Sequence, residues 1–263
     1  MRSESAIVLS AQLGLLLAAV GLLGGAAIGA VGPGGVFVTI ALFLLLPLTP
    51  AEVAGTASAT FVGTGLIGTA VYRHSGEFST VPARKLVLVL CVSSLAGAPL
   101  GARLNAVLPA AAFGNLLAAF VGILGAIIVY REVAGLHQTA WFTGAATWTR
   151  HLTLAGTGFG VSVTGAMLGV GGPILLVPIL VVLGVPTLIA VGASQVQSVI
   201  IAAGATITYA SVGAVLGWLV LLVGIPQLVG VWLGWRLAHR VNDRLLRTCL
   251  GVLLVVTAPT LAM

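Results

Sequence analysis

Long apolar runs separated by short polar intervals fill almost the whole chain. They lie at residues 6–31, 36–49, 51–72, 83–102, 111–130, 152–170, 174–185, 187–209, 214–235 and 245–262. Most of them approach the roughly 20 residues that an α-helix needs to cross about 30 Å of hydrocarbon. The runs 36–49 and 174–185 would be helices only about 18 to 21 Å long. The pattern therefore predicts ten helical segments in a membrane, two of them too short to span it alone.

The composition leads to the same class of protein. Of 263 residues, 59% are hydrophobic and 6% are charged, whereas a soluble domain carries about 25% charged residues. We therefore expect an all-α, multi-pass integral protein of the cell membrane. The run 6–31 is longer than the apolar core of a signal peptide and continues into further membrane sequence, so we favour a retained helix over a cleaved leader.

An internal repeat organises these segments. The longest polar interval, Arg131 to Arg150, lies near the middle of the chain. We expect a first transmembrane repeat at 1–131, a cytoplasmic linker at 132–150 and a second repeat at 151–263. The two halves match at offsets of 133 to 137 residues. Gly34-Gly35 pairs with Gly171-Gly172, Pro50 with Pro186, Ala57-Ser58 with Ala193-Ser194, and Tyr72 with Tyr209. Further along, Gly97, Leu100, Gly101, Arg103 and Leu104 pair with Gly230, Leu233, Gly234, Arg236 and Leu237. Because the matches occur in the same order in both halves, they predict a repeat of about five segments.

The distribution of cations predicts that the two repeats are inverted. With inverted repeats, nine cations face the cytoplasm, namely Arg73, Arg84, Lys85, Arg131, Arg150, Arg236, Arg240, Arg244 and Arg247, and only Arg2 and Arg103 lie outside. With parallel repeats the division is six to five. Cytoplasmic loops carry an excess of Lys and Arg, so we expect inversion with both termini outside. The short second segment of each half then either completes a crossing or forms a re-entrant hairpin, and the sequence does not decide between them.

Glycines interrupt the apolar pattern at corresponding places in the two halves. The stretch Gly169-Val-Gly-Gly-Pro173 precedes one short segment, and Gly29-Ala-Val-Gly-Pro33-Gly-Gly35 precedes the other. Glycine allows the backbone to unwind, and proline suits the first turn of a new helix. A helix N-terminus inside the membrane attracts anions, and paired breaks in inverted repeats indicate a substrate site near the midplane. Close packing of helices through small residues is the alternative.

Polar side chains near these breaks complete the candidate site. Ser194, Gln197 and Ser198 share one face of a helix, whereas the first half has Ser58, Phe61 and Val62 at the related positions. We therefore expect an asymmetric anion site, with the second half supplying most of the side-chain donors. An interhelical hydrogen-bonded contact would also explain the stripe. The candidate binding residues are Gly34, Gly35, Ser58, Gly171, Gly172, Ser194, Gln197 and Ser198.

Other residue types offer little further chemistry. Thr49-Pro50-Ala51-Glu52 has the pattern of a helix capping box, and the remaining acidic residues lie at the edges of segments. No buried carboxylate is therefore available for coupling transport to protons or sodium. Cys91 and Cys249 form no metal or disulfide motif, and the sparse cations do not form a nucleic-acid patch. We expect no enzymatic activity, no cofactor and no metal.

The glycine motif resembles that of a known family. Gly169-Val-Gly-Gly-Pro173-Ile-Leu-Leu-Val-Pro178, its first-half counterpart and the repeated Gly-x-x-Leu-Gly-x-Arg-Leu are similar to motifs of the TauE/SafE sulfite-exporter-like permeases, also called the toluene-sulfonate uptake permease family. The resemblance covers essentially the whole chain. In the first half, Thr39-Ile-Ala replaces the proline expected downstream of the glycines. The resemblance implies transport of small sulfur-containing anions such as sulfite or organosulfonates.

Three functions remain open at this stage. A permease with alternating access is the reading that we favour, and a passive anion channel would use the same helix termini. A membrane interaction protein, in which the glycines serve packing alone, is the third. The expected partners are a small anionic substrate, membrane lipid and a second copy in a homodimer. The sequence does not reveal the direction of transport, the coupling ion or the particular anion.

Overall fold

The computed structural model describes residues 10–74, 80–134, 147–238 and 251–261, and all regular structure in them is helical. The first half contains α1 (Ala11–Val31), the 3₁₀ turn η1 (Pro33–Gly35), α2 (Val36–Leu45), α3 (Pro50–His74), α4 (Val81–Ala106) and α5 (Ala110–Ala134). The second half contains α7 (Thr147–Leu168), α8 (Pro173–Val182), α9 (Thr187–Ser211), α10 (Gly217–Ala238) and a last helical segment (Gly251–Leu261) that ends in η2 (Ala258–Leu261). The all-helical prediction is confirmed.

Five of the described helices are long and apolar enough to cross a membrane. These spans are Ala11–Ala30, Val81–Ala106, Ala110–Tyr130, Thr187–Ser211 and Gly217–Gly234. The helices α2 and α8 are apolar but have only 10 residues each, as the sequence pattern predicted. Most of the predicted linker lies outside the described residues, although α7 already begins at Thr147.

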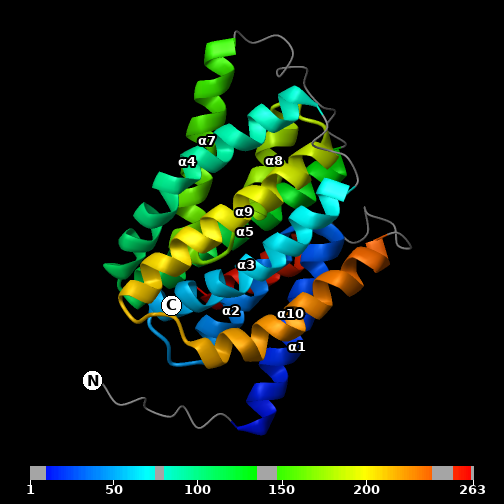
Figure 1. Cartoon of the computed structure of the whole chain (residues 1–263). Coiled ribbons are helices and arrows are strands. Elements are labelled where there is room, and N and C mark those ends of the chain that lie inside the picture. Colours follow the sequence, from blue (N-terminus) through cyan, green and yellow to red (C-terminus); the bar gives the residue numbers. More distant parts are fainter. Residues whose placement is uncertain (1–9, 75–79, 135–146, 239–250, 262–263) are drawn as a thin grey trace.

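The helices α3 and α9 lie against each other in the middle of the molecule (Figure 1). On one side, α4 packs against both α7 and α9. On the other side, α10 packs against both α1 and α3. The short helix α8 lies on α9, α2 contacts α1 and α3, and α5 contacts η2. This arrangement brings both glycine breaks next to the central pair.

Glycines allow the outer pairs of helices to approach closely. A Cβ atom on Gly25 of α1 would lie 2.0 Å from the carbonyl oxygen of Gln227, and one on Gly234 of α10 would lie 1.9 Å from that of Ala26. In the other pair, a Cβ on Gly101 of α4 would lie 2.1 Å from the carbonyl oxygen of Val163. Only a residue without a side chain fits such distances, so these glycines serve helix packing.

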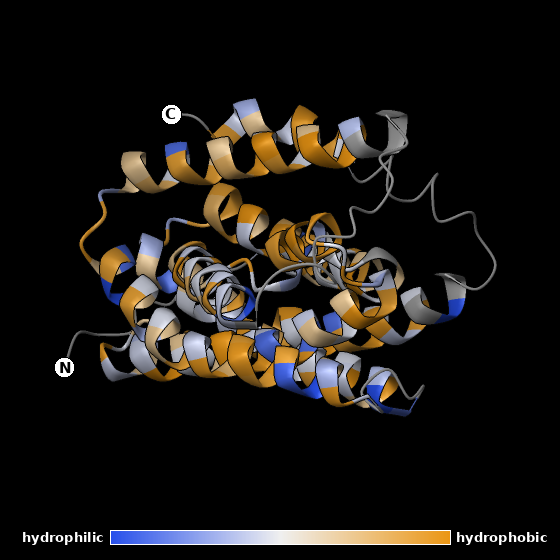
Figure 2. Ribbon diagram, turned by 90° about the horizontal axis from the view of Figure 1, so that it is seen from above, coloured by the Kyte–Doolittle hydropathy of each residue, from blue (hydrophilic) through white to orange (hydrophobic). Residues whose placement is uncertain are grey.

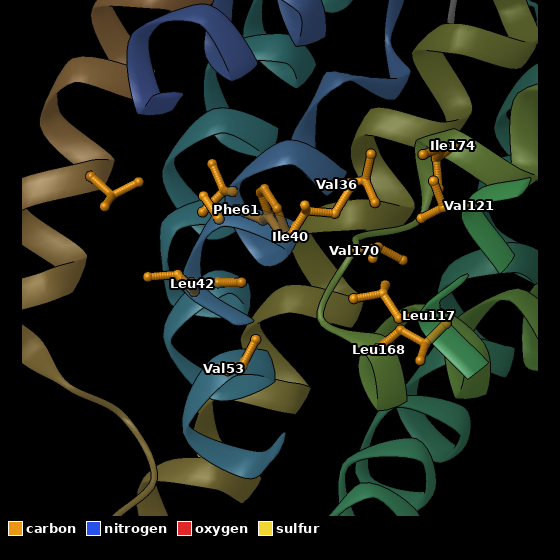
Figure 3. Close-up of a cluster of buried hydrophobic side chains, with 14 of the residues drawn as sticks. Val36, Ile40, Leu42, Val53, Phe61, Leu117, Val121, Leu168, Val170 and Ile174 are labelled. Atoms are coloured by element: carbon orange, nitrogen blue, oxygen red, sulfur yellow. The ribbon is translucent and has the colours of Figure 1, made fainter. Parts of the chain in front are cut away.

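Apolar side chains fill the interior and also cover much of the surface. A buried cluster joins α2 (Val36, Ile40, Leu42), α3 (Val53, Phe61), α5 (Leu117, Val121), α7 (Leu168), the second glycine break (Val170) and α8 (Ile174) (Figure 3). Hydrophobic residues also lie on the outer faces of the helices (Figure 2), and Leu15 and Ile207 are 73% and 72% exposed. A surface of this kind is suited to lipid. The buried polar side chains of the described residues are Ser, Thr, Asn and Gln, together with the hydroxyl of Tyr209.

Candidate functional site

The second glycine break separates α7 from α8 as the sequence predicted. Gly169 and Gly171 have φ angles of +63° and +76°, in the left-handed region that favours glycine. Pro173 then occupies the first position of α8. A Cβ on Gly169 would lie 2.5 Å from the Cα of Ala54 in α3, so the break also lies directly against the central pair. In the first half, Gly32 has a φ of +99° and is followed by η1 and α2.

Side chains from three other helices bind the carbonyl groups at the C-terminal end of α7. Asn105 of α4 donates from Nδ2 to the Met167 oxygen at 2.6 Å, and the Tyr209 hydroxyl of α9 donates to the Ala166 oxygen at 3.0 Å. Thr39 of α2 donates from its hydroxyl to the Gly169 oxygen. Carbonyl groups at a helix end have no partner within the helix, so these donors stabilise the break. Sequence reasoning assigned no such role to these residues.

The N-terminal end of α8 offers free backbone donors. Within the part of the chain that the structure describes, the N–H groups of Gly171, Gly172 and Ile174 make no hydrogen bond, and Pro173 has no N–H. The first N–H groups of a helix carry a partial positive charge because the peptide dipoles align. This end of α8 can therefore bind an anion, provided that a space and further donors lie beside it.

A small cavity provides that space. It is partly open and lies between the two glycine breaks and the central helices. Its lining comes from α1 (Ile28), the first break (Gly32, Gly35), α3 (Phe61, Thr64), the second break and α8 (Val170, Gly171, Pro173, Ile174) and α9 (Gln195, Ser198). Both halves of the chain thus contribute to one cavity.

Two side chains of α9 supply polar groups to this cavity. Gln195 and Ser198 are each only 4% exposed, and no described residue forms a hydrogen bond with either side chain. The Ser198 hydroxyl oxygen lies 3.5 Å from the position that a Cβ on Gly171 would take, so it is next to the free N–H groups. Thr64 of α3 donates its hydroxyl to the Phe61 carbonyl at 3.2 Å. A buried polar group usually has a partner, so Gln195 and Ser198 are available to a ligand.

The residues predicted for the site have different surroundings. Gly35, Gly171 and Ser198 line the cavity. Gly172 lies at the N-terminal end of α8, and a Cβ on it would be 3.6 Å from Gln197 Oε1. A Cβ on Gly34 would be 2.4 Å from the Cβ of Ala27 in α1.

The other predicted side chains lie outside the lining of this cavity. Gln197 donates from Nε2 to the Ser94 hydroxyl at 2.9 Å and to the Gly158 carbonyl at 3.1 Å, so its nitrogen faces α4 and α7. The Ser194 hydroxyl donates to the Val191 carbonyl in its own helix at 2.7 Å. Ser58 is buried in α3.

Gln195 and Thr64 were not among the predicted residues. Gln195 is one turn from Ser198 and Thr64 is one turn from Phe61, so the spacing of three residues along each helix was a usable signal.

The predicted capping box at Glu52 is confirmed. The Thr49 N–H donates to Glu52 Oε2 at 2.8 Å, and the Glu52 N–H donates to the Thr49 hydroxyl at 3.3 Å. Arg236 lies at the end of α10 with its guanidinium 3.8 Å from the ring centre of Trp232. Both charged groups therefore have contacts away from the cavity.

Comparison with known proteins identifies the family. A family model described as sulfite exporter TauE/SafE matches residues 17–261. No curated protein and no solved structure gives a significant match. The matched region includes both glycine breaks and every residue that lines the cavity. The chain is a multi-pass membrane protein and belongs to the TauE/SafE sulfite exporter family.

Proposed function

We propose that this protein is a permease of the cell membrane that carries small sulfur-containing anions, such as sulfite or an organosulfonate. The observation that supports this most directly is the pair of buried, unpartnered side chains, Gln195 and Ser198, beside the free N–H groups of α8. Neutral donors together with a helix N-terminus can replace the hydration shell of a small oxyanion. In this proposal the anion contacts the N–H groups of Gly171 and Gly172, the Ser198 hydroxyl and the Gln195 amide.

The helix contacts support a structural repeat, and the cation distribution favours its inversion as part of this proposal. The pairing of α4 with α7 corresponds to that of α10 with α1, and the contact of α4 with α9 corresponds to that of α10 with α3. A twofold relation between the halves would produce both correspondences and would make α3 and α9 counterparts. A site between two such halves suits alternating access, in which one half moves relative to the other.

A change at Ser198 tests the site. Ser198→Ala removes one donor to a charged ligand, worth about 1.5 to 3 kcal/mol, so we expect anion binding to weaken by roughly 10-fold to 100-fold. Ser211→Ala is the matched control because Ser211 is exposed at the end of the same helix and donates to the Thr208 carbonyl. Titration calorimetry of the purified protein with sulfite measures both. Unchanged affinity in a folded Ser198→Ala variant would contradict the proposed site.

Flux measurements in proteoliposomes separate the permease from a passive channel. A permease gives saturable sulfite uptake that rises when sulfite is present on the opposite side of the membrane. A channel gives a conductance that does not depend on such exchange. Ser198→Ala should raise the sulfite concentration needed for half-maximal uptake, while Ser211→Ala should not.

A further inference from the structure

The cavity at the end of α8 offers neutral donors and no cation. Its lining includes amide, hydroxyl and backbone groups but no Lys, Arg, His, Asp or Glu. The described cations lie elsewhere, at or near helix ends, where Arg73, Arg84, Lys85, Arg103 and Arg236 are exposed and Arg150 is half-buried. Any negative charge in the cavity must therefore be balanced by dipoles alone.

Dipoles of this kind balance one negative charge much better than two. A helix N-terminus is equivalent to about half a positive charge. The cost of removing an ion from water rises with the square of its charge, so a dianion loses far more hydration than a monoanion of the same size. The apolar part of the lining, formed by Ile28, Phe61, Val170 and Ile174, offers no polar side chain that could lower this cost.

We propose that this site selects singly charged oxyanions over dianions of similar size. This inference rests on the proposed function. Hydrogensulfite and alkanesulfonates meet the requirement, whereas sulfite in its doubly charged form and sulfate do not. Selection then depends on the charge of the head group and not on its shape, because all of these anions present three or four oxygens around one sulfur atom.

Selection of hydrogensulfite would couple transport to proton movement without a protein carboxylate. The anion crosses with its own proton and releases it on the far side, where hydrogensulfite dissociates into sulfite and one proton. The protein neither gains nor loses a proton in this cycle. Glu52, the acidic residue whose side chain the structure describes, is half-buried in its capping contacts with Thr49 and lies outside the lining of the cavity, so it is not placed to relay this proton.

Any pH dependence of binding must then come from the ligand. The elements around the cavity are α1, η1, α3, α8 and α9, and none of the side chains that they place in its lining is ionisable. Methanesulfonate keeps one negative charge throughout the range near neutral pH, and sulfate keeps two. Sulfite changes from one to two charges within that range, so these three anions separate the effect of charge from any titration of the protein.

Calorimetry of the purified full-length chain with these three anions tests the inference across a pH series around neutrality. We expect methanesulfonate to bind with constant affinity and sulfate to bind at least about tenfold more weakly. The apparent affinity for total sulfite should fall by roughly tenfold per pH unit once the doubly charged form dominates. The loss of methanesulfonate binding in Ser198→Ala, but not in Ser211→Ala, would place the selectivity at this cavity.

The outcomes distinguish this inference from the proposed function. Sulfite affinity that stays constant or rises with pH overturns selection by charge while leaving an anion permease intact. Methanesulfonate binding that is equal in Ser198→Ala and in the unchanged protein overturns the assignment to this cavity. If none of the three anions binds to the folded protein, the proposed function fails together with the inference.

Discussion

Glu52 shows how one acidic residue in an apolar chain can have a purely structural role. Its carboxylate accepts hydrogen bonds from the Thr49 N–H and the Thr49 hydroxyl, both at 2.8 Å, at the start of α3. Glu52→Ala removes this acceptor, and loss of a helix cap costs about 0.5 to 2 kcal/mol. Glu52→Gln keeps an acceptor oxygen and should cost less. We expect thermal unfolding to follow this order, with the pH dependence of anion transport unchanged in both variants.

A different result would give Glu52 a role in coupling. If Glu52→Gln unfolds at the same temperature as the unchanged protein but loses the dependence of transport on a proton gradient, the carboxylate carries protons. The two measurements must be made on the same preparation, so that a loss of transport is not confused with a loss of folded protein.

The residues of α9 show how far a sequence can define a site. The spacing of Ser194, Gln197 and Ser198 predicted one polar face, but the face of a helix contacts several neighbours. Gln197 donates to α4 and α7, whereas Ser198 lines the cavity, although they are adjacent in the chain. Gln195 faces the same cavity from one turn away. Which helix lies over which part of the face depends on tertiary packing, and no single-helix pattern contains that information.

At the scale of elements the sequence was more informative. The shortness of the second segment in each half, the glycine breaks and the proline at the start of α8 are local features, and the structure has all of them. The donors that hold the end of α7 are not local, because Asn105 lies 62 residues from Met167 and Thr39 lies 130 residues from Gly169. Contacts across such separations follow from the arrangement of helices and could not be derived from periodicity.

Glycine at the contact of α4 with α7 should be essential to stability. A Cβ on Gly101 would lie 2.1 Å from the Val163 carbonyl oxygen, so Gly101→Ala must push the two helices apart, and overpacking of this kind costs about 1 to 3 kcal/mol. Gly160→Ala is the matched control in α7, because a Cβ there would meet nothing within 4 Å. Thermal unfolding in detergent should show a lower midpoint for Gly101→Ala only.

The control also has an expected direction. Alanine favours a helix interior more than glycine does, by up to about 1 kcal/mol, so Gly160→Ala should unfold at an equal or higher temperature. Equal midpoints for Gly101→Ala and Gly160→Ala would show that α4 and α7 can separate at no cost, and close packing would then not explain the glycines of this pair.

At the scale of the whole molecule, the orientation of the two halves rests on charge. If the repeats are inverted, most cations lie at helix ends on the cytoplasmic side of the membrane. Lys85 near the start of α4 and Arg236 near the end of α10 then both face the cytoplasm. In Figure 1 the start of α4 lies near the top and the end of α10 at the right edge, both away from the end of α9 at the lower left. Parallel repeats would instead place Lys85 on the same side as Ser211, because Lys85 follows α3 and Ser211 ends α9, the counterpart of α3 in the second half.

Cysteine labelling in intact cells decides between these arrangements. Single cysteines replace Lys85, Arg236 or Ser211, all exposed, in a protein whose two native cysteines have been changed to serine. Loops rich in Lys and Arg stay on the cytoplasmic side of the membrane. A membrane-impermeant maleimide should therefore label position 211 from outside and should reach positions 85 and 236 only after the cells are opened. Labelling of positions 85 and 211 from the same side would contradict the inverted repeat, and the alternating movement of two opposed halves would lose its structural basis.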